Sequence, residues 1–175
     1  MKSLTIAITT LSLCSLPALA AANAPAFDRA MGPIFTRYAK IRRLLAADKS
    51  KGVAGPAKQI AKLARKLPTR VAGAHAGHYK MLPKKIKAAA TALAKARGMV
   101  KQREAFKRLS RPLALWATMS KPAGINVVFC SMAKASWLQR GKKIRNPYYG
   151  AKMLRCGEIV SGAHKGTKGG HMKHR

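Results

Sequence analysis

The fold class is decided first by the stretch "PIFTRYAKIRRLLA", residues 33–46 of this 175-residue chain. Its large apolar side chains recur at spacings of three and four, at Ile34, Tyr38, Ile41 and Leu45. That spacing places them on one face of an α-helix. Pro33 suits the first turn, where its missing N–H has no partner to lose. We therefore expect an amphipathic helix from about Asp28 or Pro33 to Ala47.

Three more helices are expected downstream, over about residues 56–67, 83–96 and 100–119, because the same periodicity returns there. Residues 69–83 carry turn-forming residues and are expected to be a loop or a broken helical turn. Pro112 lies inside the fourth segment, where proline removes a hydrogen bond and clashes with the preceding turn. That helix is therefore expected to kink there, or to end near Ser110 and restart.

The pattern changes in the last third of the chain. The β-branched run "INVVF", residues 125–129, is of strand type and leads into Cys130. Residues 161–175 are rich in glycine, lysine and histidine without apolar periodicity, so we expect a disordered tail. The sequence predicts an all-α domain over 21–160, an antiparallel four-helix bundle closed by a Cys/Met/aromatic loop or short-strand lid at 129–157.

The N-terminus is typical of a secretory signal peptide, expected over residues 1–20. Lys2 precedes an apolar run that ends in a small-residue cleavage pattern near Ala20. The alternative is a lipoprotein signal with Cys14 as the lipidated residue. No later segment approaches the roughly 20 apolar residues of a membrane-spanning helix. We expect a periplasmic protein without a transmembrane segment in its mature chain.

The charge is strongly biased, with 36 Lys and Arg against 4 acidic residues and a formal net charge of +32. Such a surface adheres to anionic surfaces, unless the charge is simply an adaptation to the medium. Nucleic-acid binding is disfavoured, because the basic residues are spread along the chain without interleaved aromatics. The scarcity of acids and the lack of a nucleophile-elbow or phosphate-loop motif predict that the protein is not an enzyme.

Sulfur is concentrated in "FCSMAKASWLQRGKKIRNPYYGAKMLRCG", residues 129–157. Cys130 and Met132 would share one side of an extended strand, and Met153 and Cys156 one face of a helical turn. If the two elements meet, their sulfurs form a site suited to Cu(I) or Ag(I). The competing hypothesis is a Cys130–Cys156 disulfide, as is usual in exported proteins, with both methionines as core packing.

Structural roles are expected for the residues that share this stretch with the sulfurs: Trp137, Asn146, Pro147, Tyr148, Tyr149, Gly150 and Gly157. The three aromatic side chains anchor the motif through buried area, or else present a ring face to a cation or partner. The Asn-Pro pair and the first glycine favour a turn, and the second glycine a helical C-cap.

Histidines form two further groups. His75 and His78 lie three residues apart and are either a metal pair or loop polar groups. The tail contains a candidate auxiliary metal-capture site, made of His164, His171, Met172 and His174.

Three segments together resemble a known family: "REAFKRLS" (103–110), "FCSMAKASWL" (129–138) and "IRNPYYGAKMLRCG" (144–157). They are similar to a bacterial periplasmic domain of unknown function, found alone and appended to adaptor subunits of copper/silver-type heavy-metal efflux pumps. The strong likeness covers 103–157, and the helical front half agrees in character. Ser131 stands where that family usually has proline. The resemblance implies heavy-metal handling, with periplasmic efflux components as partners.

Two functions follow as hypotheses. The first is binding or delivery of copper or silver ions in connection with efflux, centred on the four sulfur residues. The alternative is a disulfide-stabilised interaction module without metal, which docks through its basic surface on an anionic partner or membrane.

Overall fold

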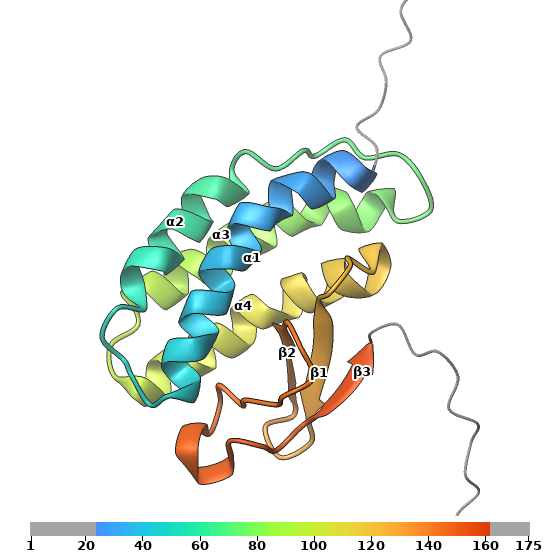
Figure 1. Ribbon diagram of the computed structural model, residues 1–175. Coiled ribbons are helices and arrows are strands. Elements are labelled where there is room, and N and C mark those ends of the chain that lie inside the picture. Colours follow the sequence, from blue (N-terminus) through green and yellow to red (C-terminus); the bar gives the residue numbers. More distant parts are fainter. Residues whose placement is uncertain (1–23, 162–175) are drawn as a thin grey trace, which may run out of the picture.

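The computed structural model describes residues 24–161, which form four α-helices and a small sheet. Figure 1 shows the helices packed together with the sheet beside them. The helices are α1 (Ala24–Ala46), α2 (Ala54–Ala64), α3 (Ala76–Lys95) and α4 (Met99–Ser120). They are followed by the strands β1 (Asn126–Cys130) and β2 (Ala135–Gln139), the short 3-10 helix η1 (Gly150–Met153), and β3 (Glu158–Ser161). The expected signal peptide lies outside the described residues, as does the expected tail apart from Ser161.

The four helices pack in chain order, α1 on α2, α2 on α3 and α3 on α4. The stripe of α1 is confirmed, because its four predicted apolar side chains are fully buried. Four helices are thus confirmed as the body of the molecule. Within residues 24–161, none of the helices combines the length and apolarity needed to cross a lipid bilayer.

Two helices begin earlier than predicted. Helix α1 starts at Ala24 and continues its buried face with Phe27 and Met31, so Pro33 lies inside the helix. Helix α3 starts at Ala76, so residues 76–83, predicted as part of a loop or broken helical turn, form regular helix instead. Tyr79 and Leu82 are buried there. In both cases burial of a further apolar turn outweighs the cost of a proline within the helix.

Helix α4 runs through Pro112 without ending, so the expected restart after Ser110 is wrong. The proline is itself buried, and Leu109 and Trp116 are buried on either side of it. The hydroxyl of Ser110 lies 2.8 Å from that of Tyr38 on α1, so it joins two helices instead of capping one.

The last third of the chain is not α-helical: it forms a three-stranded antiparallel sheet in the order β2-β1-β3, for which the prediction offered only short strands as an alternative to a loop over 129–157. The strand predicted from "INVVF" is confirmed as the central β1, whereas the positions of β2 and β3 were not predicted individually. Strand β2 packs against α4. Its edge is also held by α1, because the Leu138 N–H donates to the Tyr38 hydroxyl at 3.1 Å. The sheet thus forms a layer on the helical body (Figure 1).

Candidate functional site around the paired thiols

The sheet brings the two cysteines together. Cys130 is the last residue of β1, and Cys156 lies two residues before β3, which pairs antiparallel with β1. Their sulfur atoms are 2.8 Å apart, with Cys130 buried and Cys156 half-buried, and both are free thiols. A disulfide bond has an S–S length of about 2.05 Å, so only a small movement of the two side chains is needed to form one.

Of the two methionines, Met132 lies differently from the prediction, whereas Met153 lies in a helical turn with Cys156. The chain reverses directly after Cys130 in a turn closed by the Lys134 N–H, which donates to the Ser131 carbonyl at 3.0 Å. Met132 is therefore in a turn, with a side chain 62% exposed, and the expected shared strand face with Cys130 is wrong. Met153 is half-buried at the end of η1, and its carbonyl accepts the Cys156 N–H at 3.0 Å.

The structure places the two thiol sulfurs in direct contact. In the described part of the chain there is no group of three or more His, Cys, Asp or Glu side chains placed to hold a metal ion. His75 and His78 are exposed at the start of α3, with ring centroids 6.3 Å apart. The predicted tail site at His164, His171, Met172 and His174 lies outside the described residues.

The pKa of the Cys156 thiol is raised, first by its hydrogen bond with Cys130 and then by burial. A hydrogen bond from the Met132 backbone N–H opposes these effects. A raised pKa keeps a thiol protonated and weakens it as a nucleophile. This environment is that of a structural cysteine pair more than of a reactive catalytic thiol.

Asn146 ties together the loop that carries Cys156. Its buried side chain donates from Nδ2 to the Cys156 carbonyl at 2.8 Å. Its Oδ1 accepts the backbone N–H of Tyr148 at 2.7 Å and that of Tyr149 at 3.3 Å. Its own N–H donates to the Leu154 carbonyl at 2.7 Å. One side chain therefore sets the turn after it and holds the backbone of the second cysteine.

The aromatic residues of the motif make anchoring contacts. The Tyr148 hydroxyl donates to the carbonyl of Ser136 on β2, and the Tyr149 hydroxyl donates to the Met132 carbonyl at 3.0 Å. Trp137 is fully buried, with its ring edge-on to Tyr148 at a centroid distance of 5.8 Å. These contacts fix the hairpin turn and the Cys156 loop to each other.

Sequence reasoning missed the ion pair that joins this motif to the helices. Arg103 of α4 contacts Asp48 at 2.6 Å and donates from Nε to the Pro147 carbonyl at 3.1 Å. The Asp48 carboxylate also accepts the Ala151 N–H at 2.8 Å. A Cβ on Gly150, which has a φ of 59°, would collide with both charged groups. The sequence offered one signal for this ion pair: acids are rare, and each carboxylate in so basic a chain has many possible basic partners.

Fold and site together define a mainly helical domain completed by a small antiparallel sheet that pairs two thiols. A family model described as a protein of unknown function, DUF3347, matches residues 34–122. The match spans half of the chain, so the protein belongs to this family. It covers the helices from within α1 to the end of α4, whereas the resemblance found in the sequence was strongest over 103–157. No curated protein and no solved structure matches the chain significantly.

Proposed function

We propose that the protein is an exported periplasmic module that binds anionic membrane surfaces and is locked by a Cys130–Cys156 disulfide. The observation that carries the proposal is the unneutralised charge of the fold. Against 36 basic residues the chain has 4 acids, and residues 24–161 contain two ion pairs, Arg103–Asp48 and Lys107–Glu104. Most cationic groups are therefore available to an external anion.

The docking face in this proposal is the groove between α3 and α4. It is bordered by Lys85, Arg108 and Arg111 and floored by Ala88, Ala89, Ala92, Pro112 and Leu115. The cationic border suits lipid phosphates, and the apolar floor suits the upper part of the acyl chains. Exposed large apolar side chains elsewhere in the described residues are scattered, at Met81, Val100, Met132 and Val160. Peripheral adsorption therefore fits better than deep insertion.

The disulfide is supported by the 2.8 Å separation of the two sulfurs. Closing it removes two hydrogen atoms from the thiols, which the oxidising system of an exported compartment accepts. Linking residues 26 apart stabilises a fold by about 3.5 kcal/mol in the chain-entropy model. We expect an intact mass two hydrogens below that of the reduced chain, and a matching fall in the free energy of unfolding after reduction. An unshifted mass in protein from oxidising cells would contradict the disulfide.

Membrane docking is tested by co-sedimentation with vesicles of phosphatidylcholine containing increasing phosphatidylglycerol. Binding should rise with the anionic lipid and fall steeply with salt. The triple variant K85Q/R108Q/R111Q should lose about a hundredfold in affinity, at about 1 kcal/mol per basic residue. The charge-matched control K49Q/K51Q/R70Q, at exposed positions in the segments on either side of α2, should lose far less. Equal losses would contradict the chosen face, and equal binding to neutral vesicles would contradict the function.

The second candidate function is binding or delivery of Cu(I) or Ag(I), in connection with a heavy-metal efflux system. The adjacent thiols favour it, because soft sulfur ligands select these ions. The link to efflux rests on the resemblance of residues 103–157. In this reading Cys130 and Cys156 would be the primary ligands, and Met132, exposed in the hairpin turn, would add a thioether.

This candidate is tested by titrating the reduced protein with Cu(I) against a competing chelator. C130S should abolish binding. M132L should weaken it, whereas M81L, which changes an exposed methionine far from the thiols in sequence, should not. Unchanged affinity in C130S would exclude the thiol site, and equal behaviour of the two methionine variants would exclude Met132 as a ligand.

A further inference from the structure

Arg42 on α1 is a buried cation without a carboxylate partner. Its side chain is 9% exposed, and one guanidinium nitrogen donates to the Arg145 carbonyl at 3.2 Å. Its Nε is buried and has no hydrogen-bond partner among the described residues. Within residues 24–161, no acidic group lies within 4.0 Å of it. A buried charge in this state is costly unless something outside the chain compensates it.

The electrostatic surroundings add to this cost. The pKa of Arg42 is lowered, first by burial; Tyr38 opposes this shift, and the positive charges of Arg43 and Arg145 add to it by smaller amounts. The Tyr38 hydroxyl supplies no negative charge at neutral pH, because burial raises its pKa to about 12. A bound anion would offset the cost of burying the Arg42 charge.

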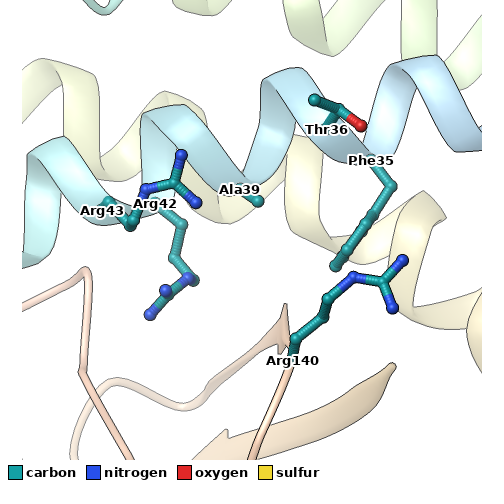
Figure 2. A pocket seen from close by; sticks show the side chains of 6 residues that line it. All are labelled: Phe35, Thr36, Ala39, Arg42, Arg43 and Arg140. Carbon is teal, nitrogen blue, oxygen red and sulfur yellow. The ribbon is translucent and has the colours of Figure 1, made fainter. Parts of the chain in front are cut away.

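Two further arginines border a hollow at the same place. The hollow has a volume of about 310 Å³ and is lined by Phe35, Thr36, Ala39, Arg42, Arg43 and Arg140. Figure 2 shows Phe35 and Arg42 pointing from α1 toward the segment that carries Arg140. The Arg140 guanidinium lies over the Phe35 ring, 5.4 Å from its centroid. Segments about one hundred residues apart thus supply three cations and no acid to one cavity.

The chemistry of the lining selects the ligand. Guanidinium groups present planar sets of N–H donors that match the oxygens of phosphate. The Thr36 hydroxyl donates its hydrogen to the Gly32 carbonyl at 3.2 Å, so the arginines are the donors to any anion. The volume lies at the low end of small-molecule sites. Phe35 and Ala39 add an apolar wall for whatever carries the anionic group.

We propose that the hollow between α1 and the end of β2 is a binding site for a phosphoryl group, on a small soluble ligand or on a lipid headgroup. Arg42 is the fixed, buried anchor of this site, and Arg43 and Arg140 are its exposed clamps. A purely structural Arg42, which only holds the Arg145 carbonyl, would need neither clamp. The proposal goes beyond the surface docking described above and stands independently of it.

The test is a calorimetric titration of the full protein with inorganic phosphate at constant ionic strength. We expect saturable binding that is at least about tenfold weaker in R43Q/R140Q, whose substituted side chains are both exposed; an unchanged circular dichroism spectrum would show that the variant is folded. The control R65Q/R97Q removes the same charge from exposed positions outside the hollow and should bind like the wild type. Unsaturable binding, or equal weakening in both variants, would overturn the site and leave only general surface charge.

A vesicle arm separates the two sources of the phosphoryl group. If the ligand is a lipid headgroup, R43Q/R140Q should bind phosphatidylglycerol vesicles more weakly than R65Q/R97Q. If it is a small soluble molecule, both should bind vesicles alike while differing toward phosphate. If the membrane proposal is wrong, the outcome is different: the wild type should not bind vesicles, whereas its titration with phosphate should be unchanged.

Discussion

At the scale of single residues, Tyr38 joins three elements through one hydroxyl group. It belongs to α1, meets Ser110 of α4 at 2.8 Å, and accepts the N–H of Leu138 on β2 at 3.1 Å. Its ring also stacks on Phe106 at a centroid distance of 4.7 Å. The sheet is therefore docked on the helices by a polar contact in the middle of an apolar core.

We expect Tyr38→Phe to lower the free energy of unfolding by about 1–3 kcal/mol, because it leaves the buried Leu138 N–H and Ser110 hydroxyl without their partner. Urea denaturation measures the loss. Adding Ser110→Ala to Tyr38→Phe should cost less than Ser110→Ala does alone, because the serine hydroxyl is already unpaired. Strict additivity of the two changes would show that this hydrogen bond does not contribute.

Gly157 illustrates a position that side chains cannot occupy. Its φ is 140°, and an added Cβ would lie 2.6 Å from the Trp137 ring. Gly157→Ala should therefore cost backbone strain of about 1–3 kcal/mol plus displacement of the ring. The matched control is Gly73→Ala, where φ is 108° but the Cβ meets open space. Equal losses in the two urea titrations would mean that the contact with Trp137 is easily relieved.

At the scale of elements, the loop between β2 and β3 is attached to the helices by charge as well as by packing. The pKa of Asp48 is lowered from its ordinary value of 3.8, first by the Ala151 N–H and then by Arg103. A carboxylate whose pKa is depressed in the folded state stabilises the fold at pH values above its ordinary pKa. That contribution is lost as the pH falls through the folded-state pKa.

Asp48→Asn should consequently be less stable than the wild type at neutral pH, and the difference should shrink on acidification below about pH 4. Thermal melts across a pH series measure it. The melting temperature of the variant should therefore depend less on pH in the acidic range than that of the wild type. A difference that stays constant down to strongly acidic pH would show that the charge of Asp48 does not hold the loop.

At the scale of the whole molecule, repulsion among basic groups opposes folding. Few carboxylates are available to offset a net charge of +32. Salt shortens the range of that repulsion, from about 30 Å at 0.01 M to about 3 Å at 1 M. We expect the melting temperature to rise with sodium chloride over this range, measured by circular dichroism. A fall would mean that attractive ion pairs dominate the stability, contrary to the two pairs found in residues 24–161.

The sequence by itself determined the helical body, because a stripe such as Ile34 to Leu45 has a period that only a helix can bury on one side. It also singled out Cys130 and Cys156 by composition. The extent of α1 and α3 depended on tertiary packing, since burial of Phe27 and Tyr79 outweighs the proline within each helix.

Strands β2 and β3, the 2.8 Å contact of the sulfurs and the arginine hollow were decided by the tertiary structure alone. Each joins segments far apart in the chain, and no local periodicity encodes such pairing. A local signal for the hollow existed in Arg42, a charged residue four positions after Tyr38 on the buried side of α1. Its meaning required Arg140, which β2 brings to the same place.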